Sequence, residues 1–199
     1  MIIGISGKKQ SGKNTVGKIL QILLQDNSLS NEEIKNILNS EDTINNNYKL
    51  VAFADKLKQI TSVLFNCSTS YFESEKFKNS LLPSNISTND KVKTYRQFLQ
   101  YVGTELFSQI NPNFWINLLF NKVNDNCIIT DVRFKKEVNE IKKRNGIVFR
   151  VISNQHLEDN HISEHDLDYY TDFDYYIYNT DDIDYLIVQL KSIITKLSI

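Results

Sequence analysis

Three residues near the start of the chain have the spacing of a phosphate-binding loop. Gly7, Gly12 and Lys13 fit the pattern G-x-x-x-x-G-K-[ST], which joins a buried strand to a helix. The glycines let the backbone bend tightly and approach phosphate oxygens, and the N–H groups at the helix start face the anion. Lys13 adds a positive charge for the β and γ phosphates. The spacing therefore predicts nucleotide binding.

Asn14 stands where this loop usually has Ser or Thr, whose hydroxyl binds Mg²⁺. An Asn carbonyl oxygen is also a ligand for a hard cation, directly or through a water. Asp131 follows the apolar run "CIIT", and we expect its carboxylate to lie beside the loop and hold Mg²⁺ or its waters. A turn residue without a metal role is the alternative for Asp131. Thr15 is expected to contact a phosphate.

The elements that must position these residues alternate along the chain. Short apolar runs predict strands at residues 1–5, 48–54, 126–134, 147–152 and 175–179. Apolar side chains at helical spacing predict helices at residues 13–24, 31–38, 55–65, 94–110, 111–123, 135–146 and 182–197. Such alternation is typical of an α/β fold around a parallel sheet, whose ligands gather at the carboxyl ends of the strands.

Composition limits the class of protein. The chain has 199 residues, of which 41% are hydrophobic and 24% are charged, with a formal net charge of −1. This suits one domain with a sizeable core and gives no electrostatic case for nucleic-acid or membrane-surface binding. No apolar run approaches the roughly 20 residues of a membrane span. Cys67 and Cys127 form no disulfide framework or metal pattern, which favours a cytoplasmic setting. A homodimer is left open.

Five side chains outside the loop have chemistry that suits phosphate or acceptor binding. Arg133 could clamp a phosphate, or it could be a solvated charge. Asp55 could orient an acceptor or cap a helix, and Arg96 could bind an acceptor phosphate or be a surface charge. Gln100 lies one turn beyond Arg96 on the same helix face. Trp115 either packs in the core or stacks against a nucleobase.

The polar segment after the fourth expected strand contains Arg150, His156, His161, Glu164 and His165. Two histidines and a glutamate can bind zinc, but "HISEH" lacks the spacing of a helical zinc motif. A lid that closes over the donor phosphates fits this segment better, because lids exclude water from phosphoryl transfer.

Several of these segments together resemble a known family. They read "SGKKQSGKNTV", "FADKLK", "YRQFLQYVGTELF…NPNFWINLL", "ITDVRF" and "HISEHDLD". They resemble the deoxynucleoside monophosphate kinases of tailed phages and large DNA viruses, from Gly4 to Asp168. The resemblance implies a single P-loop kinase domain over residues 1–199, with a helical acceptor-binding region at about 56–122 and a lid-like loop at about 150–172. It also implies a viral protein in the host cytoplasm that transfers the ATP γ-phosphate to a deoxynucleoside 5′-monophosphate.

The resemblance also implies a role for each matching residue. The ATP-binding residues are Gly7, Ser11, Gly12, Lys13, Asn14 and Thr15, with Asn179 near the adenine. Asn14 and Asp131 support Mg²⁺, and Lys13, Asp131, Arg133 and Arg150 act on the transferring group. Asp55, Arg96, Gln100 and Trp115 line the acceptor site. The family often has Asp at the position of Asn14, and an Arg shortly after "GTE" where this chain has Ser108.

Two other functions are compatible with the sequence. Animal-type phosphomevalonate kinases look similar at "SGKKQSGK", "SEHDLD" and "DFDYYIYN", which would make an isoprenoid phosphate the acceptor. A nucleotide-binding regulatory module without turnover would explain Asn14 and Ser108. The retained Lys13, Asp131 and arginines favour an enzyme over this module.

Overall fold

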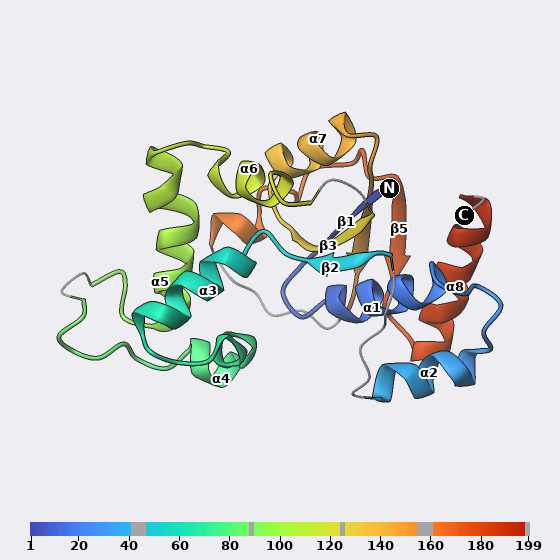
Figure 1. Ribbon diagram of the computed structural model, residues 1–199, viewed down its shortest axis with the longest axis horizontal. Helices are drawn as coiled ribbons and strands as arrows, with labels where there is room; N and C mark the ends of the chain where they lie inside the picture. Colours follow the sequence, from blue (N-terminus) through green and yellow to red (C-terminus); the bar gives the residue numbers. More distant parts are fainter. Residues whose placement is uncertain (41–46, 88–89, 124–125, 155–160, 198–199) are drawn as a thin grey trace. The chain divides into compact units, whose positions relative to one another are not determined.

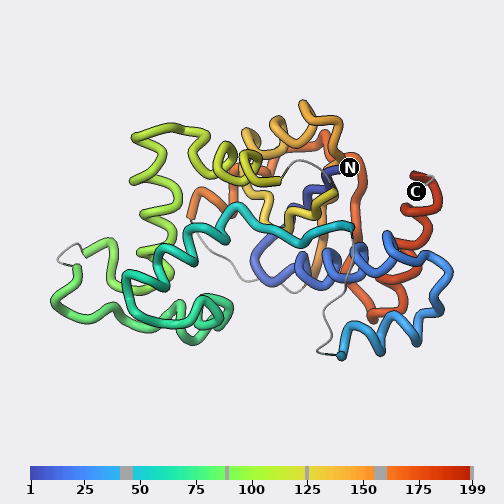
Figure 2. Tube along the Cα trace, in the orientation of Figure 1, coloured from blue at the N-terminus to red at the C-terminus, as the bar shows by residue number. Residues whose placement is uncertain are grey.

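The computed structural model describes residues 1–40, 47–87, 90–123, 126–154 and 161–197. The expected residue His156 lies outside this part of the chain. The chain forms two compact units, of which unit 1 contains Met1–Ala52 and Val123–Ile199, and unit 2 contains Phe53–Lys122. In Figure 2, unit 1 therefore carries both ends of the colour scale and unit 2 carries its middle.

Unit 1 is built on a five-stranded sheet in which every strand pair is parallel. Its strands are β1 (Ile2–Gly7), β2 (Lys49–Val51), β3 (Cys127–Val132), β4 (Ile147–Ile152) and β5 (Tyr175–Tyr178), in the order β2-β3-β1-β4-β5. In the centre of the sheet, Ile3 pairs with Ile128 on one side and Ile147 on the other. The α/β fold expected from the sequence is confirmed. The second strand was expected over residues 48–54, and it is shorter in the structure, where β2 contains only Lys49–Val51.

Helices cover both faces of this sheet (Figure 1). They are α1 (Lys13–Leu23), α7 (Lys135–Lys143) and α8 (Ile183–Lys196), and α2 (Asn31–Asn39) packs on α1 and α8. Ile3 and Ile5 of β1 belong to one fully buried cluster with apolar side chains of α1 and α8. Gly4 points to the opposite face, where a Cβ would lie 2.7 Å from Ile141 of α7. The alternation of side chains along β1 therefore fixes which helix packs on which face.

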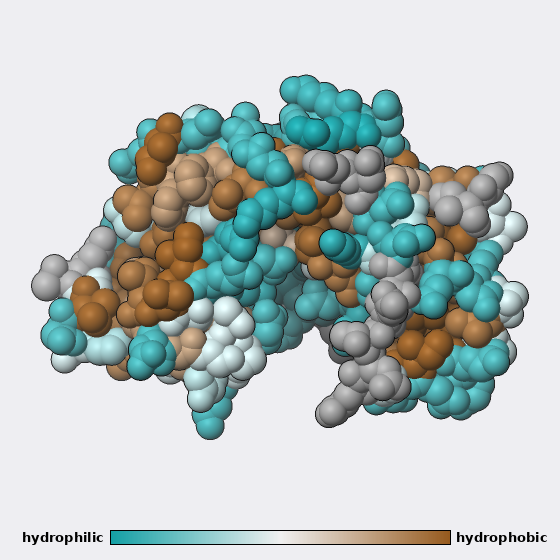
Figure 3. Space-filling view, viewed as in Figure 1, coloured by the Kyte–Doolittle hydropathy of each residue, from teal (hydrophilic) through white to brown (hydrophobic). Residues whose placement is uncertain are grey.

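In its described residues, unit 2 has helices and turns and one isolated bridge, between Leu81 and Thr94. Its elements are α3 (Asp55–Leu64), η1 (Thr69–Glu73), α4 (Glu75–Lys78), α5 (Tyr95–Tyr101), η2 (Val102–Leu106), η3 (Phe107–Gln109) and α6 (Phe114–Phe120). Thr94 and Gln97 form a reciprocal capping box at the start of α5. The unit leaves apolar side chains at its surface, among them Val63 and Leu81, as the brown areas over it in Figure 3 show.

The expectation of one continuous helix over residues 94–110 is wrong. The α-helix ends at Tyr101, and the chain continues as a π-helix over Val102–Leu106. The wider π turn changes the direction in which later side chains point, and Leu106, expected inside, is 43% exposed. The next helix, α6, begins at Phe114 rather than near residue 111.

Within the described residues, every helix is too short or too polar to cross a membrane.

Candidate active site

The turn between β1 and α1 has the tight backbone that its glycines predict. Gln10 has φ 63° and Gly12 has φ 92°, so two residues of the turn are left-handed. A Cβ at Gly12 would lie 2.3 Å from the Asn179 side chain, and one at Gly7 would lie 2.4 Å from the Ser11 hydroxyl. Larger residues at either position therefore require the turn to open.

Lys13 is held at the centre of this turn. Its ammonium group donates to the carbonyls of Gly7 at 2.8 Å and Lys8 at 2.7 Å. The pKa of Lys13 is lowered to about 8, mainly by burial and also by the positive charges of Arg133 and Arg150, while the charges of Glu164 and Asp131 act in the opposite direction. A bound anion would reverse this effect, because an opposite charge favours the charged form of a lysine. The electrostatics of the turn therefore suit a polyanion.

The side chain of Asn179, from a distant part of the sequence, contacts the same turn. Its amide donates to the carbonyl of Ser11 at 3.0 Å, and Asn179 directly follows β5. The hydroxyl of Ser11 is buried, and among the described residues it has no hydrogen-bond partner. A buried hydroxyl without a partner is costly, so a ligand oxygen that reaches Ser11 would satisfy it. Asn179 thus contacts the glycine turn, and its expected place near the adenine stays a prediction.

Arg133 directly follows β3, and the turn between β3 and α7 fixes the position of its backbone. Its backbone N–H and that of Phe134 both donate to one carboxyl oxygen of Glu137, at 2.7 Å and 3.0 Å. The pKa of Glu137 is raised to about 8, mainly by burial and also by the nearby charge of Asp131. The guanidinium of Arg133 pairs with the carboxylate of Glu164.

Arg150, on β4, is more enclosed than Arg133. Its side chain is 11% exposed, and it donates to the Ser6 hydroxyl at 2.9 Å. The guanidinium also lies 5.4 Å from the ring centre of Phe173 and 3.9 Å from the carboxylate of Asp168. Burial lowers the pKa of Arg150. Arg150 is therefore fixed by partners on β1 and in the segment before β5.

The segment 161–172 brings carboxylates to the same cations. Glu164, in the short helix η4 (Ile162–Glu164), accepts the Lys9 N–H at 3.0 Å. Asp168 pairs with Lys8, and its other oxygen lies 2.9 Å from His165 Nδ1. Burial alone would raise the pKa of Asp168, but the hydrogen bonds from Lys8 and His165 outweigh it and lower that pKa.

The expected metal ligands lie in unit 1 at the start of α1 and at the end of β3. Asn14 is exposed, and Asp131 is partly buried. Over the described ranges, with gaps at 41–46, 88–89, 124–125, 155–160 and 198–199, no three acidic, histidine or cysteine side chains gather as a metal site. Magnesium in kinase sites uses one or two protein oxygens together with substrate phosphates, so Asn14 and Asp131 fit that mode of binding.

The expected acceptor residues all belong to unit 2. Arg96 pairs with Glu75 at 2.5 Å and donates to Asn79 at 2.9 Å. Trp115 donates its indole N–H to the carbonyl of Gly103 at 2.8 Å, and packs edge-on against Phe107 and Phe114.

Asp55 is the first residue of α3, and it is not the residue that ends β2. Gln100 is partly buried in α5, and its backbone carbonyl accepts the Thr104 hydroxyl at 2.7 Å. The acceptor roles of these residues stay predictions.

The fold and site geometry define the class of protein. An all-parallel sheet with a glycine turn after its first strand, flanked by helices, is an α/β fold consistent with a P-loop kinase. The sequence model of the family described as deoxynucleotide monophosphate kinase matches residues 24–190. The chain therefore belongs to the deoxynucleotide monophosphate kinase family, whose members are phosphotransferases acting on deoxynucleotide monophosphates. No curated protein sequence matches the chain.

This match confirms the predicted activity, and it favours neither the phosphomevalonate kinase nor the regulatory module. A kinase family implies ATP as the phosphoryl donor and small molecules as substrates. The matched residues begin at residue 24, after the glycine turn. The interpretation of the turn as a nucleotide-binding element therefore depends on its own spacing and geometry, and not on the family match.

Two carboxylates of the site were not assigned roles from the sequence. Glu137 reads as an ordinary surface residue of "KKEVNEIKK", yet it is 6% exposed and holds the turn that carries Arg133. Its place as the third residue of the expected helix is a capping position, which could have revealed it. Asp168 reads as part of a polar loop, and its two permanently charged neighbours, Lys8 and Arg150, come from other strands and loops of the chain.

Proposed function

We propose that the turn from Gly7 to Thr15 binds the phosphates of ATP, and that Lys13, Arg133 and Arg150 neutralise charge on the γ-phosphoryl group during its transfer. The observation that carries this proposal is the geometry of the glycine turn, in which the carbonyls of Gly7 and Lys8 hold the Lys13 ammonium at the centre; burial there lowers the pKa of Lys13. Phosphoryl transfer needs positioning and charge neutralisation more than covalent chemistry. A phosphate acceptor is already ionised, so no general base is demanded.

Asn14 and Asp131 are our candidates for Mg²⁺, with at least one of them acting through a water. Bound Mg²⁺ would neutralise charge on the β and γ phosphates. Replacing Asn14 with Asp adds a negative charge at the position that the resembling kinases often fill with Asp. We expect Asn14→Asp to lower the Mg²⁺ concentration needed for half-maximal turnover. Unchanged Mg²⁺ dependence in both Asn14→Asp and Asn14→Ala would remove Asn14 from the metal site.

Unit 2 is proposed to bind the deoxynucleoside monophosphate, with Arg96 on its phosphate and Gln100, Asp55 and Trp115 nearby. The ion pair between Arg96 and Glu75 supplies a matched control. We expect Arg96→Ala to raise the KM for the deoxynucleotide while the KM for ATP stays unchanged. Glu75→Ala breaks the same ion pair but leaves the guanidinium. Equal effects from both variants would make Arg96 a structural residue and exclude it from the acceptor site.

The donor side is tested by titrating the protein with ATP and following the heat of binding. Lys13→Met is expected to weaken ATP binding by at least about 30-fold, because it removes a charge-assisted contact to phosphate of the stronger kind. Lys18→Met is the control, since Lys18 is exposed on the same helix. Equal ATP affinity in the Lys13→Met variant and the wild type would refute the proposed donor site.

The expectation that the protein does not bind nucleic acid depends on its composition. A net charge of −1 offers no electrostatic footprint for nucleic acid, so we propose small-molecule substrates only.

A further inference from the structure

Glu164 contacts both the glycine turn and Arg133, the residue that follows β3. Its side chain is 6% exposed, and its two carboxyl oxygens have different partners. One oxygen pairs with the guanidinium of Arg133, and the other accepts the N–H of Lys9 at 3.0 Å. The backbone carbonyl of Glu164 also accepts the Lys8 ammonium at 2.6 Å.

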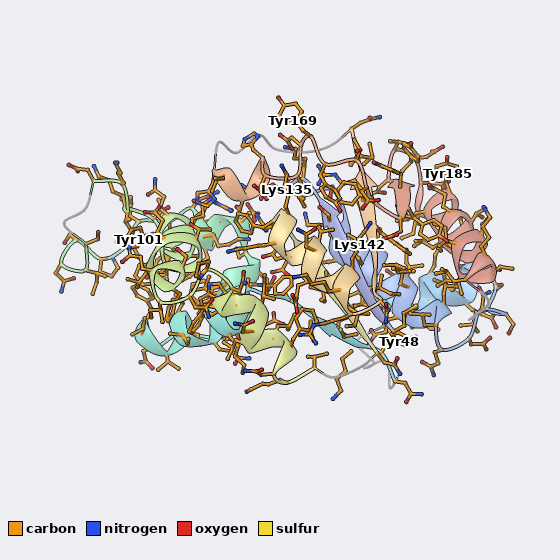
Figure 4. The ribbon with its side chains drawn as sticks, turned by 90° about the horizontal axis from the view of Figure 1, so that it is seen from above. Tyr48, Tyr101, Lys135, Lys142, Tyr169 and Tyr185 are labelled. Carbon is orange, nitrogen blue, oxygen red and sulfur yellow. The ribbon has the colours of Figure 1, made fainter. Side chains whose placement is uncertain are left out.

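The segment that carries Glu164 is itself fastened along α7. Asp166 accepts the N–H of Lys135 at 2.7 Å, and Asp172 accepts the Lys142 ammonium at 2.8 Å. Lys135 and Lys142 mark the two ends of α7 in Figure 4, whereas Tyr169 between these anchors projects into solvent and is 94% exposed. The position of the Glu164 carboxylate is therefore fixed by the contacts of Asp166 and Asp172 with α7, and it does not depend on the ion pair with Arg133 alone.

Arg133 needs such a fixed partner. Its side chain is 37% exposed, and a long side chain in that position loses rotamer freedom when it is ordered at a reacting group. A guanidinium that is already held in place avoids this loss during the reaction.

We propose that Glu164 is a positioning residue for phosphoryl transfer, which holds the Arg133 guanidinium beside the glycine turn before nucleotide binds. This inference rests on the proposed function, in which Arg133 acts on the transferring phosphate. The alternative role is competition. In that case the Glu164 carboxylate and the phosphate of the nucleotide bind the same two donors, Arg133 and the Lys9 N–H, so the carboxylate must give up these contacts when phosphate binds.

The variant Glu164→Gln separates the two roles. A glutamine keeps the shape of the side chain and can accept the Lys9 N–H, but it has no negative charge for Arg133. Positioning predicts that kcat falls by about 10- to 100-fold, the effect of a misplaced catalytic group, while the KM for ATP changes by less than about threefold. Competition predicts tighter ATP binding without a fall in kcat, and that result would overturn the inference.

The test is a double-mutant cycle with Glu164→Gln, Arg133→Ala and both together, measured as kcat with ATP and a deoxynucleoside monophosphate. If Glu164 acts through Arg133, the glutamine variant loses activity in the wild-type background and loses nothing more in the Arg133→Ala background. Equal losses in both backgrounds would overturn the inference but leave Arg133 in its proposed role. Full activity of Arg133→Ala would overturn both the inference and that role.

Two further variants guard against a purely structural effect. Glu164→Asp keeps the charge, and we expect it to recover part of the lost kcat; no recovery would count against positioning. Glu140→Gln is the matched control, since Glu140 of α7 pairs at 2.9 Å with Arg144, which directly follows that helix. Thermal unfolding of every variant shows whether it is folded. If Glu164→Gln does not fold, the cycle is run with Glu164→Asp, and the same additivity criterion decides.

Discussion

Lys13 connects the chemistry of the site to the stability of the fold. Its pKa lies near 8 instead of 10.5, because burial and two neighbouring guanidinium groups disfavour its charge. The gap corresponds to about 3 kcal/mol of free energy between the charged and neutral forms. In the protein without ATP, the charged Lys13 therefore destabilises the folded state, and bound phosphate would remove this cost.

The sign of the pH dependence follows from this gap. In the unfolded chain Lys13 keeps its proton up to its ordinary pKa of 10.5, whereas in the folded chain it loses the proton near pH 8. Between these values the unfolded state binds more protons, so the stability of the folded protein rises with pH. Other groups also titrate in this range, so the useful quantity is the stability of the wild type relative to Lys13→Met.

We expect this relative stability to increase by about 2 kcal/mol between pH 7 and pH 9.5, as the penalty for burying the Lys13 charge is relieved. The assay is urea unfolding of both proteins at the two pH values without nucleotide, with Lys18→Met as the control for loss of a lysine as such. A difference between wild type and Lys13→Met that stays constant, or that changes in the opposite direction, would refute the electrostatic description of the turn.

Three further predictions follow from single contacts. Gly12→Ala, at φ 92° and facing Asn179, should lose about 1–2 kcal/mol of stability and bind ATP more weakly; a calorimetric titration with unchanged affinity would contradict this. Glu137→Gln keeps an oxygen for both backbone N–H groups, so it should match the wild type in urea unfolding below about pH 4.5. From there to about pH 8 it should become progressively the more stable protein, because folding holds a proton on Glu137 that the unfolded chain releases near pH 4.5. Trp115→Phe removes the indole donor to Gly103 but keeps an aromatic ring, so it should lose about 1 kcal/mol of stability, and thermal unfolding equal to that of the wild type would show that this hydrogen bond is replaced by water.

The main parts of the donor site could be predicted because they depend on local spacing and on a general property of parallel sheets. Gly7, Gly12 and Lys13 are close in the sequence, and their pattern specifies a turn before a helix. Residues that follow different strands meet at one edge of the sheet, so the positions of Arg133 and Asn179 near this turn follow from the strand assignments.

Contacts between distant segments could not be predicted in this way. Nothing in the spacing pairs Arg96 with Glu75, which is 21 residues earlier, or Arg133 with Glu164, which is 31 residues later. The π-helix at Val102–Leu106 was also missed. It shifts the backbone hydrogen bonds by one residue, and the apolar pattern of the segment suits an ordinary α-helix equally well.

The most direct test of the whole account measures ADP release when the purified protein is given ATP, Mg²⁺ and each deoxynucleoside monophosphate in turn. Phosphomevalonate serves as a further acceptor, and Lys13→Met is measured beside the wild type. The account predicts turnover with one or more of the deoxynucleotides and a loss of at least about 100-fold in Lys13→Met, as expected when a group that stabilises transition-state charge is removed. Turnover with phosphomevalonate alone, or full turnover in Lys13→Met, would contradict it.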